Sequence, residues 1–363
     1  MDKTEVLNKL YERLTALEED EGITPVYRWE WEQGVGLFSI YKLYEATGDK
    51  RCLEFLNGWY EKMLGKGFDK NINTMSPLLA LTYLYEAEKN TDYLEVIKEN
   101  AEWLMNKMPR TVEGGMQHLT THTINNDQLW ADTLFMTILF LARAGMVLNN
   151  QKMQDEAVYQ TIIHIKYLSD CESGLWYHGW SLTERHFGGI FWGRGNCWIT
   201  IAIPEILTIV EEISMTDRRL LEEAYKRQVG ALIKYQDISG MWRTIINDED
   251  SYFETSATAG FAYGILTGVK YGAIDKSHYL NSYMAVRYIV SNYLGEDGSL
   301  KQVSAGTAMG YDSEHYKNIG FCRIYGIYIH NACIFIIGPL TFIIRSNSGH
   351  IVCVFLPRKC PVI

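Results

Sequence analysis

The sequence predicts an all-α protein with the fold of an (α/α)6 barrel, in which six helical hairpins close into a ring. Amphipathic helical patterns follow one another almost without a break, and the alternation typical of strands is scarce. Glycine-aromatic turns recur as GGMQH, SGLWYHGW, SGMWRT and DGSLKQV, and their markers Gly115, Gly174, Gly240 and Gly298 are 59, 66 and 58 residues apart. A step of about sixty residues fits two helices and their loops, so the 363 residues accommodate six hairpins.

The helices can be assigned in chain order. Leu7, Leu10, Leu14 and Leu17 recur at spacings of three and four residues, which places them on one face of an opening helix. Similar patterns predict helices near 35–47, 51–64, 77–89, 92–107, 130–147, 152–168, 198–214, 217–235, 256–270 and 277–293. In such a barrel the loops at one end carry the functional site. An open helical solenoid is the alternative, but it needs polar capping repeats that we do not find in the sequence.

The composition favours one large domain and argues against nucleic acid as a partner. No linker rich in Pro, Gly or Ser divides the first 315 residues, so we expect residues 1–320 to form one domain. The net charge is -10 and no dense basic patch is present, whereas phosphate binding needs clustered Lys and Arg. The acidic start MDKTEVLNKLYERL is unlike a signal peptide and predicts a cytoplasmic protein, which we expect to be a monomer or homodimer.

Asp132 stands out in WADTLFM, at the start of a strongly apolar helix. An unpaired carboxylate is costly to bury, so its apolar neighbours need an explanation. Asp132 either caps the helix or is hydrogen-bonded in the core, or it is a general acid whose pKa is raised by apolar surroundings. The residues alone leave both interpretations open.

Two histidines occupy matching glycine-aromatic turns of successive hairpins. His118 lies in GGMQH and His178 in LWYHGW. A histidine in a polar turn is commonly solvated, but matching turns lie at the same end of a barrel. We therefore expect both side chains near one site.

Arginine and tryptophan complete the candidate residues. In FWGRGNCW, Arg194 precedes Trp198 by four residues, so both can project from one face of a helix start. A guanidinium can bind a carboxylate with two hydrogen bonds, and an indole can stack on a sugar ring. Trp29 and Trp31 in RWEWEQG fit either core packing or a sugar platform.

Metal and cofactor chemistry find little support in the sequence. HLTTH at 118–122 has HxxxH spacing but lacks the Glu of HExxH and a nearby third ligand. Phosphate loops, GxGxxG and the GxSxG nucleophile elbow are absent. We expect neither a metal nor an organic cofactor.

Taken together, the motifs resemble glycoside hydrolase family 105, the unsaturated rhamnogalacturonyl hydrolases. The matching pieces run in order from about residue 28 to 316: RWEWEQG, YEATGDKR, WADTLFM, GLWYHGW, FWGRGNCW, GMWRT, FETSATAGFAYGI and GTAMGYDSEHY. The resemblance implies that Asp132 is the catalytic acid and base. It also implies a subsite for the unsaturated sugar lined by Trp31, Asn73, His118, Trp130, His178, Arg194 and Trp198. Asn73 falls where related enzymes can carry a second Asp, which puts a two-carboxylate scheme in doubt.

The resemblance also implies the reaction. Asp132 would protonate C4 of the C4=C5 double bond of a terminal unsaturated galacturonic acid and then help water add at C5, while Arg194 or a histidine holds the carboxylate. The substrate would be a short rhamnogalacturonan oligosaccharide. Alternatives are an unsaturated glucuronyl hydrolase acting on glycosaminoglycan-type disaccharides and a sugar-binding protein without catalysis.

The C-terminal segment departs from the rest of the chain. Residues 321–363 contain no Asp or Glu and four of the seven cysteines, Cys322, Cys333, Cys353 and Cys360. Residues 324–344 are apolar enough to raise a membrane-spanning alternative, although His330, Asn331, Gly338 and Pro339 weaken it. Our interpretation is that the reading frame has shifted near residue 320, with the first part of this tail packing as the twelfth helix.

Overall fold

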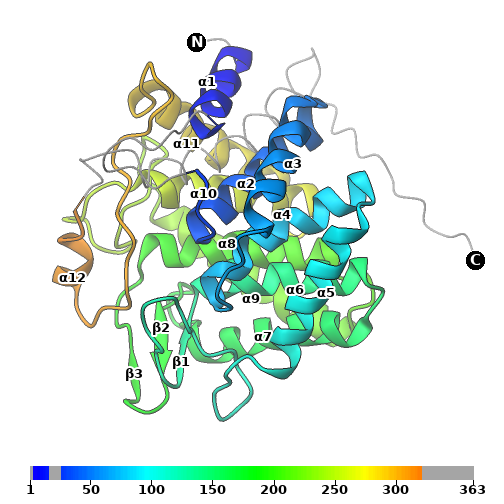
Figure 1. Cartoon of the computed structure of the whole chain (residues 1–363). Helices are drawn as coiled ribbons and strands as arrows, with labels where there is room; N and C mark the ends of the chain where they lie inside the picture. The colour runs from blue at the N-terminus through cyan, green and yellow to red at the C-terminus, as the bar shows by residue number, and fades with distance from the viewer. Residues whose placement is uncertain (1–2, 16–25, 321–363) are drawn as a thin grey trace, which may run out of the picture.

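The computed structural model describes residues 3–15 and 26–320, which form a ring of helices in two layers (Figure 1). The outer layer consists of α1 (Lys3–Thr15), α3 (Arg51–Leu64), α5 (Thr91–Asn106), α7 (Gln151–Leu168), α9 (Met215–Lys234) and α11 (Tyr279–Asn292). The inner layer consists of α2 (Trp31–Thr47), α4 (Ile72–Glu88), α6 (Leu139–Val147), α8 (Gly193–Ile209) and α10 (Thr255–Tyr271).

The inner helices pack against one another in chain order, α2 on α4, α4 on α6, α6 on α8 and α8 on α10. They are buried on nearly every side, whereas the outer helices alternate between buried and exposed residues. Helices that are apolar all round lie inside a protein, and amphipathic ones cover them. The predicted (α/α)6 barrel is confirmed. The predicted twelfth helix, which would complete the sixth hairpin, lies outside the described residues.

The repeated turns share one backbone conformation. Gly114, Gly174, Gly240 and Gly298 all have positive φ, between 78° and 93°, a region that favours glycine. The left-handed residue of the first turn is Gly114 rather than the marker Gly115 used for the sequence repeat. Each turn follows an outer helix, α5, α7, α9 or α11. The predicted hairpin repeat therefore corresponds to a real structural repeat.

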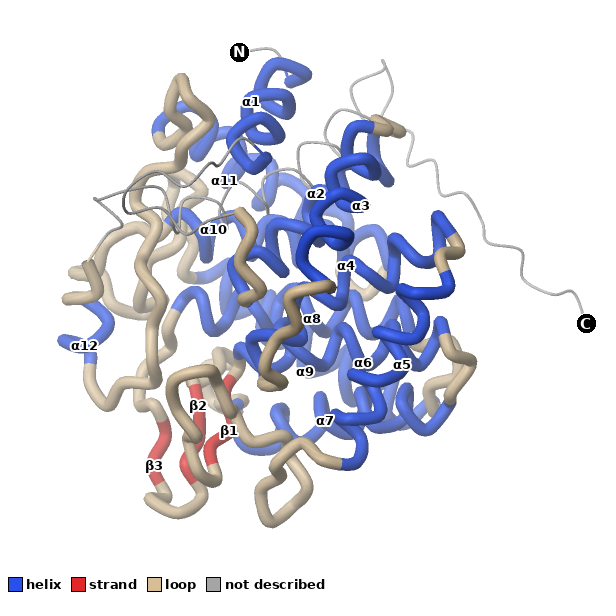
Figure 2. The backbone as a smooth tube through the Cα atoms, viewed as in Figure 1, coloured by secondary structure: helices blue, strands red, loops and turns tan. Residues whose placement is uncertain are grey.

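A small antiparallel sheet links two of these turns to the start of α6. It contains β1 (Gln128–Trp130), β2 (Gly179–Ser181) and β3 (His186–Phe187) in that order. Trp130 pairs with Gly179, and the Ala131 N–H donates to the carbonyl of His178 at 2.8 Å. The strands lie at the same side of the molecule as the long loops (Figure 2).

Several helix boundaries differ from the sequence prediction. The helix expected from residue 130 begins at Asp132 instead, because Trp130 is extended in β1. It then passes through one π-helical turn, η1 (Leu134–Ile138), into α6. The inner helices α2, α4 and α8 begin four or five residues earlier than expected. Glu30 and Asn71 are the N-caps of α2 and α4. The polar residues that follow these caps are therefore part of the first helical turn, although their composition is typical of a loop.

Short elements complete the described chain, namely η2 (Lys276–His278) and α12 (Ser313–Lys317). Among the described helices, none combines the length and apolar character needed to cross a membrane. The predictions made for residues 321–363, including the shifted reading frame, lie outside the described residues.

Candidate active site

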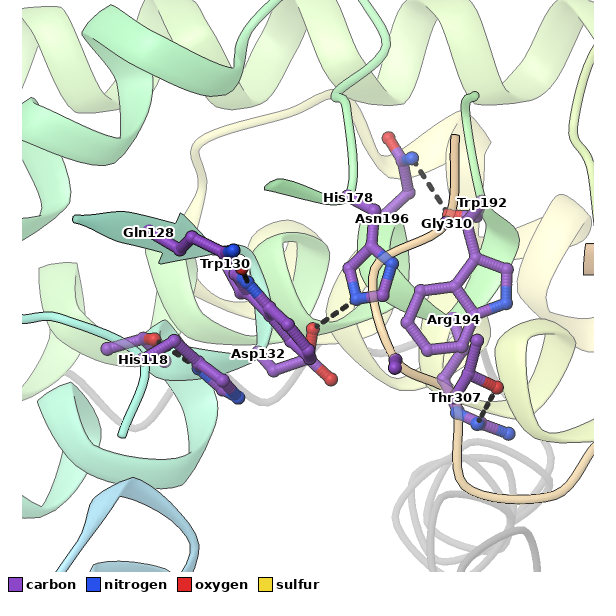
Figure 3. A network of polar contacts seen from close by, with 12 residues as sticks. His118, Gln128, Trp130, Asp132, His178, Trp192, Arg194, Asn196, Thr307 and Gly310 are labelled. Atoms are coloured by element: carbon purple, nitrogen blue, oxygen red, sulfur yellow. Dashed lines mark hydrogen bonds and ion pairs between the residues drawn. The ribbon is translucent and has the colours of Figure 1, made fainter. Parts of the chain in front are cut away.

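Asp132 lies at the start of the helical segment that follows β1, where its carboxylate meets His178 (Figure 3). The distance from His178 Nε2 to Asp132 Oδ2 is 3.2 Å. His178 is fully buried, whereas the Asp132 side chain keeps 16% of its surface exposed. The carboxylate is thus held from one side and remains open on the other.

The two histidines flank the same tryptophan, as their matching turns predict. The His118 ring stacks on Trp130 with centroids 4.2 Å apart, and His178 meets the Trp130 ring at 5.1 Å in an edge-on arrangement. His118 Nδ1 is 2.9 Å from the hydroxyl of Thr133. Each histidine is four residues beyond the left-handed glycine of its turn, so one repeated backbone path delivers both rings to this site.

The electrostatics of the site differ from the expectation for Asp132. Burial alone would raise the pKa of its carboxyl, but the hydrogen bond from His178, with a smaller contribution from the charge of Arg194, lowers it below its ordinary value. Of the two interpretations that the sequence leaves open for Asp132, the hydrogen-bonded carboxylate describes the free protein, and a raised pKa is not found. Burial also lowers the pKa of His118, to about 3.

Arg194 lies in the first turn of α8 with its guanidinium fixed by a loop from the other end of the chain. Its Nη1 donates to the carbonyl and hydroxyl of Ser304 at 2.8 and 2.5 Å. Its Nη2 donates to the carbonyl of Ala305 at 2.6 Å and to the hydroxyl of Thr307 at 3.0 Å. These bonds use four of the five donors of the guanidinium, so Arg194 organises residues 304–307 beside the site.

The remaining predicted residues line the neighbouring inner helices. Trp31, at the start of α2, meets Trp198 of α8 edge-on with centroids 6.4 Å apart. Trp198 also contacts Phe135 at 5.0 Å and is buried. Trp29, by contrast, packs in the core against Phe68.

Asn73 is half-buried in the first turn of α4. The preceding residue, Ile72, donates its N–H to the carbonyl of Leu119 and accepts a bond from Thr137 of η1. These bonds place the backbone beside Asn73 between the segment of His118 and the helix that follows Asp132.

Comparison with known proteins assigns the chain to a family. The model of Glycosyl Hydrolase Family 88 matches residues 4–330. The chain belongs to glycosyl hydrolase family 88. A relative of this family 88 chain is the unsaturated rhamnogalacturonyl hydrolase YesR of Bacillus subtilis, 33% identical over 304 residues that cover 83% of this chain and 86% of the relative.

Solved structures agree with the predicted resemblance to family 105, which is confirmed. A possible member of the GH105 family from Salmonella enterica is 38% identical, with a TM-score of 0.88, and the match covers 95% of this chain and 94% of that one. Another, from Klebsiella pneumoniae, is 37% identical with a TM-score of 0.88 and covers 95% and 93% of the two chains. This family 88 chain is therefore a glycoside hydrolase.

Several residues beside the site of this family 88 chain were not predicted. Trp192 packs on His178 at 4.2 Å, and Tyr316 reaches the same histidine from α12. Asn196 holds the turn of His178 through bonds with both the N–H and the carbonyl of Trp176. Trp192 and Tyr316 both lie within the motifs FWGRGNCW and GTAMGYDSEHY. The contact of Tyr316 with His178 joins residues 138 positions apart, and motif spacing gives no signal for such a contact.

Proposed function

We propose that this glycoside hydrolase releases a 4,5-unsaturated galacturonic acid from the non-reducing end of rhamnogalacturonan oligosaccharides by hydrating the C4=C5 double bond. The observation that carries the proposal is the partly open Asp132 carboxylate bonded to His178 and framed by Trp130. The activity named for the Bacillus subtilis relative supports this choice of substrate.

The chemistry assigned to Asp132 is two proton transfers in sequence. The protonated carboxyl gives its proton to C4, and the electron pair of the double bond forms the new C–H bond. Water then adds to C5 while its proton returns to the Asp132 carboxylate. The C5 hemiketal opens and the neighbouring sugar leaves from C1. No further acid is consumed, so one carboxyl group suffices even with Asn73 in place of a second Asp.

The cycle begins with a protonated Asp132, whereas the pKa of this carboxyl is low in the free protein. Substrate binding must therefore raise the pKa of Asp132. The uronate brings a second negative charge to the site, and like charges within a few ångströms raise the pKa of a carboxyl. Binding would then also displace water from the exposed part of Asp132, which acts in the same direction. The bound uronate thereby makes Asp132 a stronger proton holder at the moment when an acid is needed.

The other residues take supporting roles in the proposal. Trp31, which is half-buried, offers an apolar surface for the sugar ring, while the buried Trp130 and Trp198 pack behind the site. The remaining N–H of Arg194 and the ring of His118 are suited to the uronate carboxylate and hydroxyls.

The test is the decay of the ultraviolet absorbance of the conjugated C4=C5 uronate, with unsaturated galacturonyl-rhamnose as substrate. We expect decay with the wild type and a loss of at least about 10²-fold in kcat for Asp132→Asn, because a positioned general acid contributes roughly 10²–10⁴. Asp127→Asn is the matched control. Asp127 lies five residues earlier, and its positive φ is one that Asn tolerates. This control should retain wild-type decay.

Each other outcome identifies an alternative. Decay only with an unsaturated chondroitin disaccharide would assign the glucuronyl activity. Binding of the galacturonyl disaccharide without decay would indicate a sugar-binding protein and would overturn the proposal. The cytoplasmic location and the monomer or homodimer state stay predictions.

A further inference from the structure

A buried tyrosine lies behind the Asp132–His178 pair. Tyr316 is fully buried in α12, and its hydroxyl is 2.9 Å from His178 Nδ1. The opposite ring nitrogen of the same histidine, Nε2, faces Asp132 Oδ2 at 3.2 Å. Tyr316, His178 and Asp132 thus form one line from the small buried cluster of Trp192, Ile245 and Tyr316 to the open side of the site.

The direction of these hydrogen bonds follows from Gly310. The Gly310 N–H donates to the Tyr316 hydroxyl at 3.0 Å, so the hydroxyl oxygen already accepts one bond. Its own proton can reach the Gly310 carbonyl only at 3.5 Å, the outer limit for an O–H···O bond, whereas His178 Nδ1 is 2.9 Å away. Burial raises the pKa of Tyr316 well above its ordinary value, so the hydroxyl keeps its proton.

The ring of His178 is held in this orientation from several sides. Trp192 packs on it at 4.2 Å and Trp130 meets it at 5.1 Å. The carbonyl of His178 accepts the N–H of Ala131, which ties the histidine backbone to the residue beside Asp132. A flip of the ring would break both hydrogen bonds and disturb this packing.

We propose that Tyr316 is a positioning residue that donates its hydroxyl proton to His178 Nδ1, thereby fixing the neutral Nε2–H tautomer and directing that N–H at Asp132 Oδ2. Which nitrogen of a histidine carries the proton is set by the bond that the other nitrogen makes. With Oδ2 occupied by His178, Oδ1 is the Asp132 oxygen that carries the transferred proton. The consequence for turnover rests on the proposed function, but the tautomer does not.

The first experiment is nitrogen NMR of the full-length protein labelled with [15N]histidine, at pH 7.5 and without substrate. His178→Gln identifies the His178 signals by their loss. We expect an unprotonated Nδ1 and a protonated Nε2. A protonated Nδ1, in either the other tautomer or the imidazolium, would overturn the inference even if the enzyme hydrolyses the proposed substrate.

The second experiment removes only the hydroxyl, with Tyr316→Phe. We expect a mixture of tautomers at His178 and a fall in kcat of about tenfold or more with KM changed less than about threefold, because the lesion misdirects a proton without touching substrate. Tyr311→Phe is the matched control, since Tyr311 lies just before α12 but bonds Glu184 at the surface. Wild-type tautomer and kcat in Tyr316→Phe would refute the inference. If this variant fails to fold, the wild-type spectrum still tests the inference, because a protonated Nδ1 excludes donation by the Tyr316 hydroxyl.

Discussion

Asp132 and Glu32 are both carboxyl groups at the starts of inner helical segments, yet their pKa values move in opposite directions. Asp132 gains a hydrogen-bond donor in His178, which outweighs its burial. Burial raises the pKa of Glu32 to about 7, with a further contribution from Glu30, and its Oε2 has no hydrogen-bond partner within the described residues. A partner, rather than depth, decides which carboxylate stays charged.

The pKa of Glu32 predicts a pH-dependent cost to stability. Because its folded pKa lies above its unfolded value of 4.5, the folded state holds the extra proton, and stability is lost as pH rises from 4.5 through about 7. We expect Glu32→Gln to gain stability relative to the wild type across this window, by up to about 3 kcal/mol between pH 4.5 and 8. Urea unfolding at both pH values measures this difference.

The exposed Glu61 of α3 provides the control for this measurement. Glu61→Gln should show no comparable change between the two pH values. A constant difference between Glu32→Gln and the wild type would contradict the raised pKa.

At the scale of elements, α10 approaches α8 and α9 through a row of glycines. A Cβ at Gly264 would meet the carbonyl oxygen of Thr200 at 2.3 Å, and one at Gly268 would meet the Tyr225 hydroxyl at 2.2 Å. The Tyr225 hydroxyl donates to the carbonyl of Gly264 at 2.8 Å. The close approach of these helices therefore depends on missing side chains.

Alanine substitutions should separate packing from helix propensity. Gly264→Ala should lower the free energy of unfolding by about 1–3 kcal/mol, since backbone atoms of α8 must move. Gly58→Ala and Gly230→Ala lie in the outer helices α3 and α9 with nothing within 4 Å of the new Cβ, so they should raise it by about 0.5–1 kcal/mol. Thermal and urea unfolding of the three variants provide the comparison, and stabilisation by Gly264→Ala would contradict the packing described.

The elements also show which features a sequence can predict. Helix periodicity and the glycine repeat are local, so the barrel and the shared turns of His118 and His178 could be predicted. The position of Trp130 in a strand could not, because pairing with Gly179 overrides its helical neighbours. The hydrogen bond of Arg194 with Ser304 and the contact of Tyr316 with His178 join residues more than 100 positions apart. Local sequence patterns cannot predict such contacts.

At the scale of the whole molecule, charged side chains gather at the C-terminal ends of the inner helices, opposite the candidate site. Lys42 of α2 lies 4.9 Å from the ring of Tyr83 and 3.2 Å from Glu45. Burial lowers the pKa of Lys42, but the charge of Glu205 and its other neighbours raises it well above its ordinary value. Glu205 accepts a bond from Tyr263 of α10. Helix C-termini favour cations, which fits the location of Lys42.

This cluster predicts non-additive stability effects. Lys42→Met should lower the free energy of unfolding by more than about 1 kcal/mol, the upper range for an exposed ion pair, because it removes the cation whose charge acts on the buried Glu205. Lys42→Met combined with Glu205→Gln should cost clearly less than the sum of the two single changes, as measured by urea unfolding in a double-mutant cycle. The exposed pair of Lys226 and Glu223 on α9 is the control, and Lys226→Met should cost under about 1 kcal/mol. Additive losses at Lys42 and Glu205 would show that the two charges act independently.

The third glycine-aromatic turn carries Thr244 where the first two carry His118 and His178, four residues beyond Gly240. Its carbonyl accepts the N–H of Gly193, at the start of α8. In a barrel built from one repeated turn, the backbone of the turn sets the position of the side chain, while the residue type at that position can vary. Single substitutions at such positions exchange reactive groups without rebuilding a loop, so the scaffold can diversify its chemistry while its architecture stays constant.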